Sequence, residues 1–295
     1  MSDSFSQTHP VTGFLFFRSA IGFSMFLMHP VCVVISLCAS FAYALLLGGK
    51  RLLLFFLRFL LPTALLIAVI NPLVSHRGAT ILRYLPWDNP LTLESVIYGA
   101  ASALMLCSAA LWFSCLNRVM TSDKLICLFG RAAPALSLVL TMALRFVPRF
   151  FDQLRLVRTA QGQIHHCEKK SPAARFKGGV RVLSIMVSWS MENALDTSDS
   201  MKSRGYGLGG RTAFSVFRFA RRDAFIIASV AAESAGIAAL LIFGGVKYRY
   251  YPFFKGNFTD AASFAVYVLY ALLLLTPLIF DCWEGIRWTR SRSRI

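Results

Sequence analysis

Six apolar stretches, each long enough to cross a lipid bilayer, constrain this chain more than any other feature of its sequence. They cover about 11–28, 31–48, 56–74, 95–116, 223–244 and 262–281. A bilayer core of about 30 Å needs roughly 17 to 25 residues of helix, because a helix rises about 1.5 Å per residue. The chain is 56% hydrophobic and only 15% charged, a balance that excludes an ordinary soluble domain. The sequence therefore predicts an all-α polytopic membrane protein with about six transmembrane helices.

The positive charge is distributed in a way that predicts the orientation in the membrane. The formal net charge is +17, and 18 of the 31 lysines and arginines lie in residues 117–222. With six spans, that segment shares one side of the membrane with Lys50, Arg51, Arg58 and the basic C-terminus. Basic loops remain in the cytoplasm. We therefore expect a multi-pass protein of the cell membrane with both termini cytoplasmic, and we attribute the charge to topology rather than to nucleic acid.

This arrangement divides the chain into three regions. Residues 1–116 form an N-terminal membrane region with about four transmembrane helices. Residues 117–222 form a cytoplasmic region of long helices, and residues 223–295 form a C-terminal membrane region with about two transmembrane helices and a basic tail. Two charges fall inside the predicted spans, Arg18 and Glu233. Charges at membrane depth are costly, so either residue can be functional, or Arg18 can extend to the interface while Glu233 faces the bundle interior.

The cytoplasmic region contains two helical patterns that carry opposite charge. The first covers 134–161, with Pro148 expected to kink it, and places Arg145, Arg149 and Arg155 on one face. The second is expected over 179–202, where Glu192, Asp196 and Asp199 form an acidic stripe. The stripe can pair locally with Lys202 or with the arginine face of the first helix.

A cluster of glycines ends the second helical pattern. Gly205, Gly207, Gly209 and Gly210 stop a helix and allow the backbone to approach another surface closely. Arg204 lies at this tip. It can be a cation that offsets the helix dipole, or a planar fork that binds carboxylates in an acidic groove of a partner.

Metal chemistry finds little support in the sequence. None of the seven cysteines is paired at a zinc-ligand or redox spacing. His165, His166 and Cys167 are adjacent, but neighbouring side chains on a helix diverge by about 100°. We interpret them as a polar surface turn and predict no metal site and no catalytic residues.

Several short motifs occur along the chain in a recognisable order. They are NPL at 71–73, SHRG at 75–78, LTLE at 91–94, YG at 98–99, LRFVP at 144–148 and DSMKSRGYG at 199–207. In this order and spacing the chain resembles the transmembrane T component of energy-coupling factor (ECF) transporters, the EcfT/CbiQ-like family of ABC-type vitamin and metal-ion importers. The most specific stretch is similar to the family's Ala-Arg-Gly signature, with Ser203 in place of the alanine.

The resemblance implies a coupling subunit. In that family, two long cytoplasmic helices end in arginine motifs that dock on two ABC-type ATPase subunits, and the membrane part holds a substrate-binding S component. The resemblance assigns ATPase docking to residues at both tips, namely Ser203, Arg204, Gly205, Tyr206 and Gly207 at the second, and Arg158, Ala160 and Gln161 at the first. The first motif lacks its arginine, and Arg158 stands one turn earlier. This difference would suit two non-identical ATPases.

Other functions are less consistent with the sequence. The chain has no G-x-x-x-x-G-K-[ST] loop, so it should not hydrolyse ATP, and we expect no cofactor here, with ATP and Mg²⁺ bound by the partner ATPases. A membrane-embedded enzyme would need a nucleophile paired with a base, and a nucleic-acid-binding protein would need aromatic platforms within the basic patch. A self-contained secondary transporter is the main alternative. It would need ionisable or broken-helix sites near the bilayer midplane.

Overall fold

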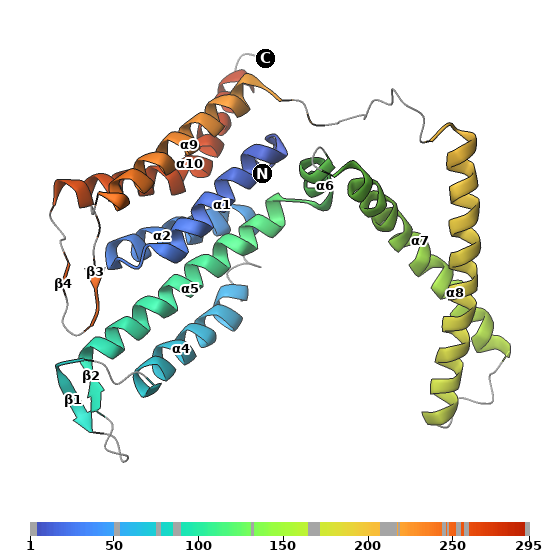
Figure 1. Ribbon diagram of the computed structural model, residues 1–295, viewed down its shortest axis with the longest axis horizontal. Helices are drawn as coiled ribbons and strands as arrows, with labels where there is room; N and C mark the ends of the chain where they lie inside the picture. Colours follow the sequence, from blue (N-terminus) through green and yellow to red (C-terminus); the bar gives the residue numbers. More distant parts are fainter. Residues whose placement is uncertain are drawn as a thin grey trace. The chain divides into compact units, whose positions relative to one another are not determined.

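A computed structural model describes most of the chain. The described residues are 5–49, 54–74, 78–84, 90–130, 133–164, 172–206, 217, 219–243, 246, 248–251, 255–256 and 260–292. The chain forms two compact units, one made of residues 1–125 and 217–295 and the other of residues 126–216. Figure 1 shows that helices dominate both units.

The first two helices of the membrane unit follow each other closely in the chain. Helix α1 covers Pro10–Phe26 and α2 covers Pro30–Gly48. Each begins with proline, which lacks the N–H that a first helical turn leaves unpaired. The preceding histidine caps each helix: Nδ1 of His9 accepts from the N–H of Val11, and Nδ1 of His29 accepts from the N–H of Val31, both at 3.3 Å.

Helix α5 (Leu93–Val119) is the central element of the membrane unit. It packs against α1, α2 and α4 (Leu61–Val74), which continues from a π-helical turn, η2, at Phe56–Leu60. The α4–α5 contact is close at Gly99, where an added Cβ would lie 3.0 Å from the carbonyl oxygen of Ala68. Nearby, the side-chain amide of Asn71 donates to Oγ of Ser102 at 3.0 Å.

A short hairpin precedes α5. Strands β1 (Ile81–Tyr84) and β2 (Pro90–Thr92) pair antiparallel. The buried carboxylate of Glu94 accepts hydrogen bonds from the N–H and the hydroxyl of Thr80. Gly78 lies against Glu94 and Thr92 with no space for a Cβ. These contacts hold the segment that leads into β1 against the start of α5.

Helices α9 (Arg221–Ile242) and α10 (Ala261–Arg292) complete the membrane unit. They pack against each other, and β3 (Tyr248–Arg249) and β4 (Lys255–Gly256) form a small antiparallel pair between them in sequence. Oδ1 of Asp223 accepts from the N–H of His9 at 3.2 Å and thereby joins the starts of α9 and α1. The predicted basic tail is partly helical, because α10 continues to Arg292 without a proline or glycine to end it after Gly285.

The core of this unit is aromatic. The rings of Phe16, Phe17, Tyr43 and Trp112 are almost completely buried and pack against one another and against Phe5 of the short helix η1 (Phe5–Gln7). Nε1 of Trp112 donates to Oγ of a serine on α2 at 3.4 Å, which satisfies the indole N–H in the apolar interior.

The predicted fold class is confirmed, with one difference in detail. Every predicted span has a helical counterpart, and five helices of the described chain are long and apolar enough to cross a membrane. The first counterpart, α1, has 17 residues and extends only about 25 Å. Its caps explain this length, because the histidine-proline pairs at 9–10 and 29–30 fix where α1 begins and where α2 follows.

The two charges within the spans have different surroundings. Arg18 is exposed on α1. Glu233 lies on the same face of α9 as Ile226, Val230 and Ile237, and its Oε2 is buried with no hydrogen-bond partner in the described part of the chain. Of these two charged side chains, only the carboxylate of Glu233 points toward the interior of the helix bundle.

The second unit is built on two long helices. The short helix α6 (Ser122–Gly130) leads to α7 (Pro134–Ile164), and α8 covers Pro172–Ser203. Helix α7 stays helical through Pro148 and ends three residues later than predicted. The predicted start of the second helix at residue 179 is wrong. Helix α8 begins at Pro172, a favourable first residue, and includes Gly178 and Gly179 despite their weak helix propensity.

Candidate functional site

Helix α8 ends in a Schellman motif at Gly205. The N–H of Tyr206 donates to the carbonyl oxygen of Met201, and the N–H of Gly205 donates to the carbonyl oxygen of Lys202, both at 3.0 Å. Gly205 has a φ of 73°, a left-handed conformation that glycine adopts without the steric cost of a Cβ. The glycine therefore fixes the direction in which the chain leaves the helix.

This motif presents Arg204 at the tip of α8. Arg204 occupies the C-cap position and is exposed, as are Ser203 and Tyr206. The hydroxyl of Ser203 donates back to the carbonyl oxygen of Ser200 at 3.0 Å, so it is already used within the helix. Among the described residues, no carboxylate forms an ion pair with Arg204. Gly207 lies outside the described residues.

The tip of α7 has a different character. Arg158 and Ala160 are exposed and Gln161 is partly buried, and all three lie within the helix, which ends at Ile164. The residues at the position where the resemblance leads us to expect the first arginine motif therefore form the last helical turn of α7. They do not form a cap that ends the helix with glycine, as at the tip of α8. His165, His166 and Cys167 lie outside the described residues.

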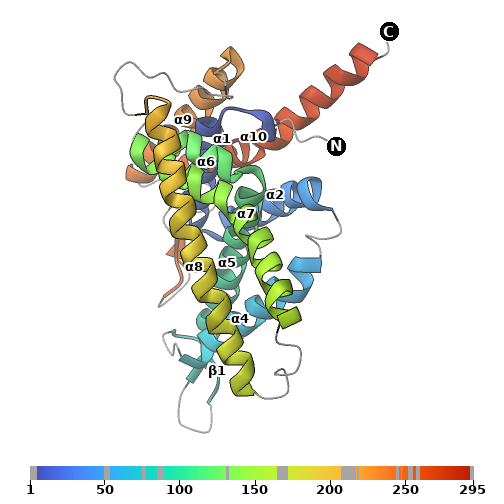
Figure 2. The same cartoon turned by 90° about the vertical axis from the view of Figure 1, so that its right-hand side faces the viewer.

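Helices α7 and α8 pack against each other (Figure 2), and apolar side chains lie in their contact. The ring of Phe150 on α7 lies 6.4 Å from the ring of Trp189 on α8, centroid to centroid. Met186 is almost completely buried, and Val157 is buried as well. This contact lies near the middle of both helices and supports the two tips. Trp189 was not among the residues predicted from the sequence, although its spacing of three from Met186 marks one helix face.

The predicted charge partners form local ion pairs within their own helices. Arg155 pairs with Asp152 at 3.9 Å, and Lys202 pairs with Asp199 at 3.7 Å, all with well-exposed side chains. Of the two pairings expected for the acidic stripe, the local one with Lys202 is therefore observed, at Asp199. In the described chain, no ion pair joins Arg145, Arg149 or Arg155 to the acidic stripe. Pairing between the two helices, which would also involve Glu192 and Asp196, stays a prediction.

An exposed apolar stripe is a second feature of α8. Val180, Leu183, Val187, Met191 and Leu195 recur at intervals of three or four residues, so they share one face of the helix, and each is at least half exposed. We name these five residues the α8 stripe. Large exposed apolar surfaces of this kind mark contacts with proteins or membranes. Their regular spacing was the sequence signal that could have revealed the stripe.

Comparisons with known proteins point to one family. The model of the CbiQ family, described as cobalt transport protein, matches residues 2–214 of this chain. An energy-coupling factor transporter transmembrane protein, EcfT, of Lactobacillus helveticus is 33% identical over 95 residues, which cover 32% of this chain and 34% of that protein. An EcfT of Bacillus selenitireducens is 27% identical over 112 residues, 37% of this chain and 42% of that protein.

A further relative has a different name. A putative ABC transporter ATP-binding protein of Bifidobacterium longum is 27% identical over 189 residues, which cover 59% of this chain but only 24% of that protein. The chain thus spans less than half the length of each of these relatives.

Proposed function

This chain belongs to the CbiQ family, and we propose that it is the transmembrane coupling subunit of an ECF-type ABC importer. In this role it transmits the ATP-driven motion of two ATPase subunits to a membrane-embedded S component that binds a vitamin or a metal ion. The EcfT names of two relatives support a transmembrane component of such transporters.

The observation that carries this proposal is the tip of α8. A long helix ends in an exposed arginine whose position is fixed by the Schellman motif at Gly205. A guanidinium group can bind a carboxylate through two parallel hydrogen bonds, which fixes orientation as well as position. A rigid helix that ends in such a fork can transmit a displacement of the partner that holds it. We therefore assign ATPase docking to 203–207.

The second docking contact is proposed at the tip of α7. Arg158 is exposed there, and Ala160 and Gln161 follow within the last turns of the helix. The two tips differ in sequence and in how the helices end, so they favour two ATPase subunits that are not identical. The match to part of an ATP-binding protein supports an association with ATPases. This chain lacks a P-loop, so we place ATP and Mg²⁺ in the partners.

The α8 stripe supports contact with an apolar partner. A helix of the coupling region that exposes Leu183, Met191 and Leu195 requires a protein or lipid surface to cover them. We propose that the membrane-embedded S component covers this stripe. We also propose that both termini and residues 117–222 are cytoplasmic, which is the orientation in the membrane that the positive-inside rule predicts.

Affinity purification of the tagged chain from membranes of its own host tests this function. Mass spectrometry of the retained proteins should identify two ABC-type ATPases and a small apolar membrane protein. Substrate uptake by proteoliposomes should require those ATPases and ATP. Uptake by the purified chain alone, driven by an ion gradient, would instead establish a secondary transporter and exclude the coupling role.

A further inference from the structure

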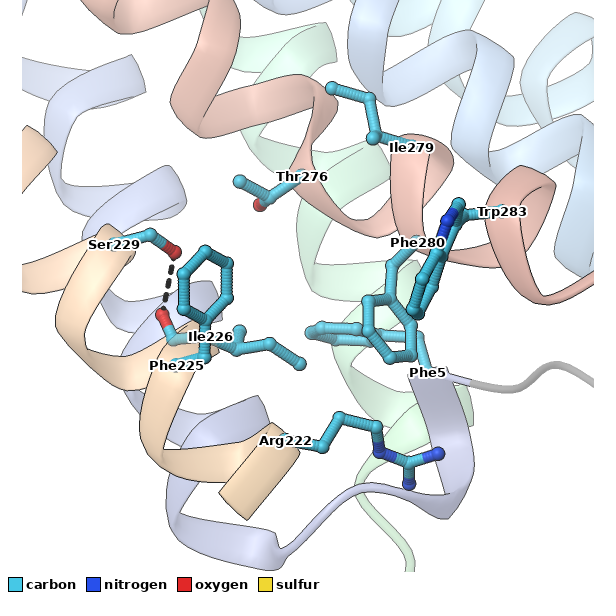
Figure 3. Close-up of a pocket in the computed structure, with 9 residues that line it drawn as sticks. All are labelled: Phe5, Arg222, Phe225, Ile226, Ser229, Thr276, Ile279, Phe280 and Trp283. Atoms are coloured by element: carbon cyan, nitrogen blue, oxygen red, sulfur yellow. Dashed lines mark hydrogen bonds between the residues drawn. The ribbon is translucent and has the colours of Figure 1, made fainter. Parts of the chain in front are cut away.

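A cavity of about 460 Å³ lies between α9 and α10, beside the short helix η1. Figure 3 shows the rings of Phe5, Phe280 and Trp283 grouped on one side and Phe225 of α9 on the other. The volume lies within the range of sites that bind small organic ligands, roughly 300 to 1,000 Å³. Neither the proposed coupling role nor the helix tips involve this cavity.

The cavity wall is apolar despite the hydroxyl groups in it. The hydroxyl of Ser229 donates to the carbonyl oxygen of Ile226 at 2.9 Å (Figure 3), and that of Thr276 donates to the carbonyl oxygen of Leu273 at 2.8 Å. Both donors are therefore used by their own helices. A space of this kind offers water few hydrogen bonds, so it favours a hydrocarbon chain.

The wall is also accessible from outside the bundle. Phe225, Ile279 and Trp283 are each more than half exposed, and they belong to helices that are long and apolar enough to span a membrane. An occupant can therefore enter from the bilayer. The backbone N–H of Phe5 donates to Oδ1 of Asp281 at 3.0 Å, which holds η1 against α10 and closes the cavity on that side.

One edge of the cavity is cationic. Cζ of Arg222 lies 5.4 Å from the ring centroid of Phe280, and in Figure 3 its guanidinium group lies at the periphery of the aromatic side chains. Arg222 belongs to the first turn of α9, where a transmembrane helix meets the headgroup region. A basic side chain near the headgroup region of a membrane attracts anionic headgroups.

We propose that this cavity binds one acyl chain of an anionic phospholipid, whose phosphate interacts with Arg222. The apolar wall would bind the acyl chain. The guanidinium group at the edge of the cavity would favour a negatively charged headgroup. Trp283, an amphipathic ring, suits the boundary between hydrocarbon and headgroup. The lipid contacts α9, α10 and η1. It lies near the N-terminal end of α9.

Native mass spectrometry of the purified full-length chain tests this proposal. The protein is titrated with phosphatidylglycerol or with phosphatidylcholine of the same acyl composition, and the retained lipid is counted. One basic side chain near an anionic headgroup contributes about fivefold to binding. We expect phosphatidylglycerol to be retained at least about fivefold more strongly than phosphatidylcholine. Equal retention of the two lipids would overturn the proposal.

Three variants locate the lipid. Arg222→Gln should remove the preference for phosphatidylglycerol. Arg221→Gln removes the same charge from the same turn but does not line the cavity, so it should keep most of the preference. Ser229→Phe should occupy the cavity and reduce retention of both lipids. The proposal is wrong if both arginine variants lose the preference equally, or if a folded Ser229→Phe retains lipid normally.

Discussion

The N–H of Tyr206 lies 3.0 Å from the carbonyl oxygen of Met201 and closes the end of α8. This bond spans the left-handed residue Gly205, so the tip depends on a conformation that a side chain opposes. A helix end that carries force to a partner must be held by its own backbone. The motif provides this support from within α8 itself.

Gly205→Ala should therefore damage the tip while leaving the rest of the protein intact. A left-handed alanine costs about 1 to 2 kcal/mol relative to glycine, which favours a frayed last turn. We expect reduced ATPase co-purification and reduced uptake at normal membrane abundance. The matched control is Gly178→Ala, a helical glycine of α8 with open space around its Cβ position. That change should be neutral or should stabilise α8 by up to about 1 kcal/mol. Equal loss in both variants would contradict the role of the left-handed residue.

The sequence predicted the membrane helices well because their signal is simple. Apolar length determines the spans, and the histidine-proline pairs before α1 and α2 mark their starts. It failed at the start of α8, which was expected at residue 179 but lies at Pro172, so that the helix includes Gly178 and Gly179. Local propensity is a weak guide in such a long helix, because contacts such as those of Met186 and Trp189 stabilise it elsewhere.

The sequence also identified the α8 tip but not the surfaces that depend on packing. Arg204 and Gly205 stand next to each other in the chain, so a local motif reveals them. The α9–α10 cavity brings Phe5 next to Phe280 and Trp283 from the other end of the chain. No local pattern encodes that proximity. Glu94 and Thr80 likewise meet only because the β1–β2 hairpin reverses the chain.

The contact between α4 and α5 should be sensitive to any side chain at position 99. An added Cβ would lie 3.0 Å from the carbonyl oxygen of Ala68 and 3.2 Å from Asn71 and Pro72, and backbone atoms cannot move aside cheaply. Gly99→Ala should destabilise the membrane unit by about 1 to 3 kcal/mol. Thermal unfolding of the purified protein in detergent measures this loss. Gly22→Ala on α1, with nothing within 4 Å of its Cβ position, should unfold at the wild-type temperature. A comparable loss there would show that any membrane glycine is sensitive.

The stability of the chain should fall in mild acid because of His29. This residue lies between α1 and α2, and burial lowers the pKa of its imidazole from the ordinary value of 6.5. Below pH 6.5 the unfolded chain binds a proton that the folded chain does not, so unfolding becomes easier. The contribution is present above pH 6.5 and is lost as the pH falls through the folded-state pKa. Melting temperatures in detergent between pH 8 and pH 5 measure the effect.

The variant that isolates this histidine is His29→Asn. Asparagine retains a side-chain oxygen that can cap α2 but does not titrate in this range. Part of the acid-induced decrease in melting temperature should disappear. The decrease should remain in His9→Asn, which alters the cap of α1 and leaves His29 in place. If His29→Asn melts with the wild-type pH dependence, the acid sensitivity arises elsewhere.

Arg204 is the residue on which the coupling proposal depends most directly. It is exposed in the isolated chain and has no ion-pair partner among the described residues, so removing it should not affect folding. If it docks in a groove, its loss leaves a buried carboxylate of the ATPase unpaired, at a cost of about 2 to 5 kcal/mol. Arg204→Ala should therefore abolish or sharply reduce uptake and ATPase co-purification at normal membrane abundance. Arg204→Lys should recover only part, because lysine keeps the charge but loses the planar fork.

Lys202→Ala provides the matched control for this prediction, because it removes a neighbouring exposed charge whose observed pair with Asp199 is local. An exposed pair of this kind contributes at most about 1 kcal/mol, so uptake and co-purification should stay close to wild type. The three variants need uptake, abundance and ATPase retention measured on the same membrane samples. Near-normal uptake in Arg204→Ala would show that this arginine is only a cation at the end of the helix. A charge that only offsets the helix dipole contributes about 0.3 to 1 kcal/mol, so its loss would have little effect on uptake. An equal loss of uptake and ATPase retention in Lys202→Ala would indicate diffuse attraction of basic residues to an acidic surface. The planar guanidinium group of Arg204 would then make no specific contact.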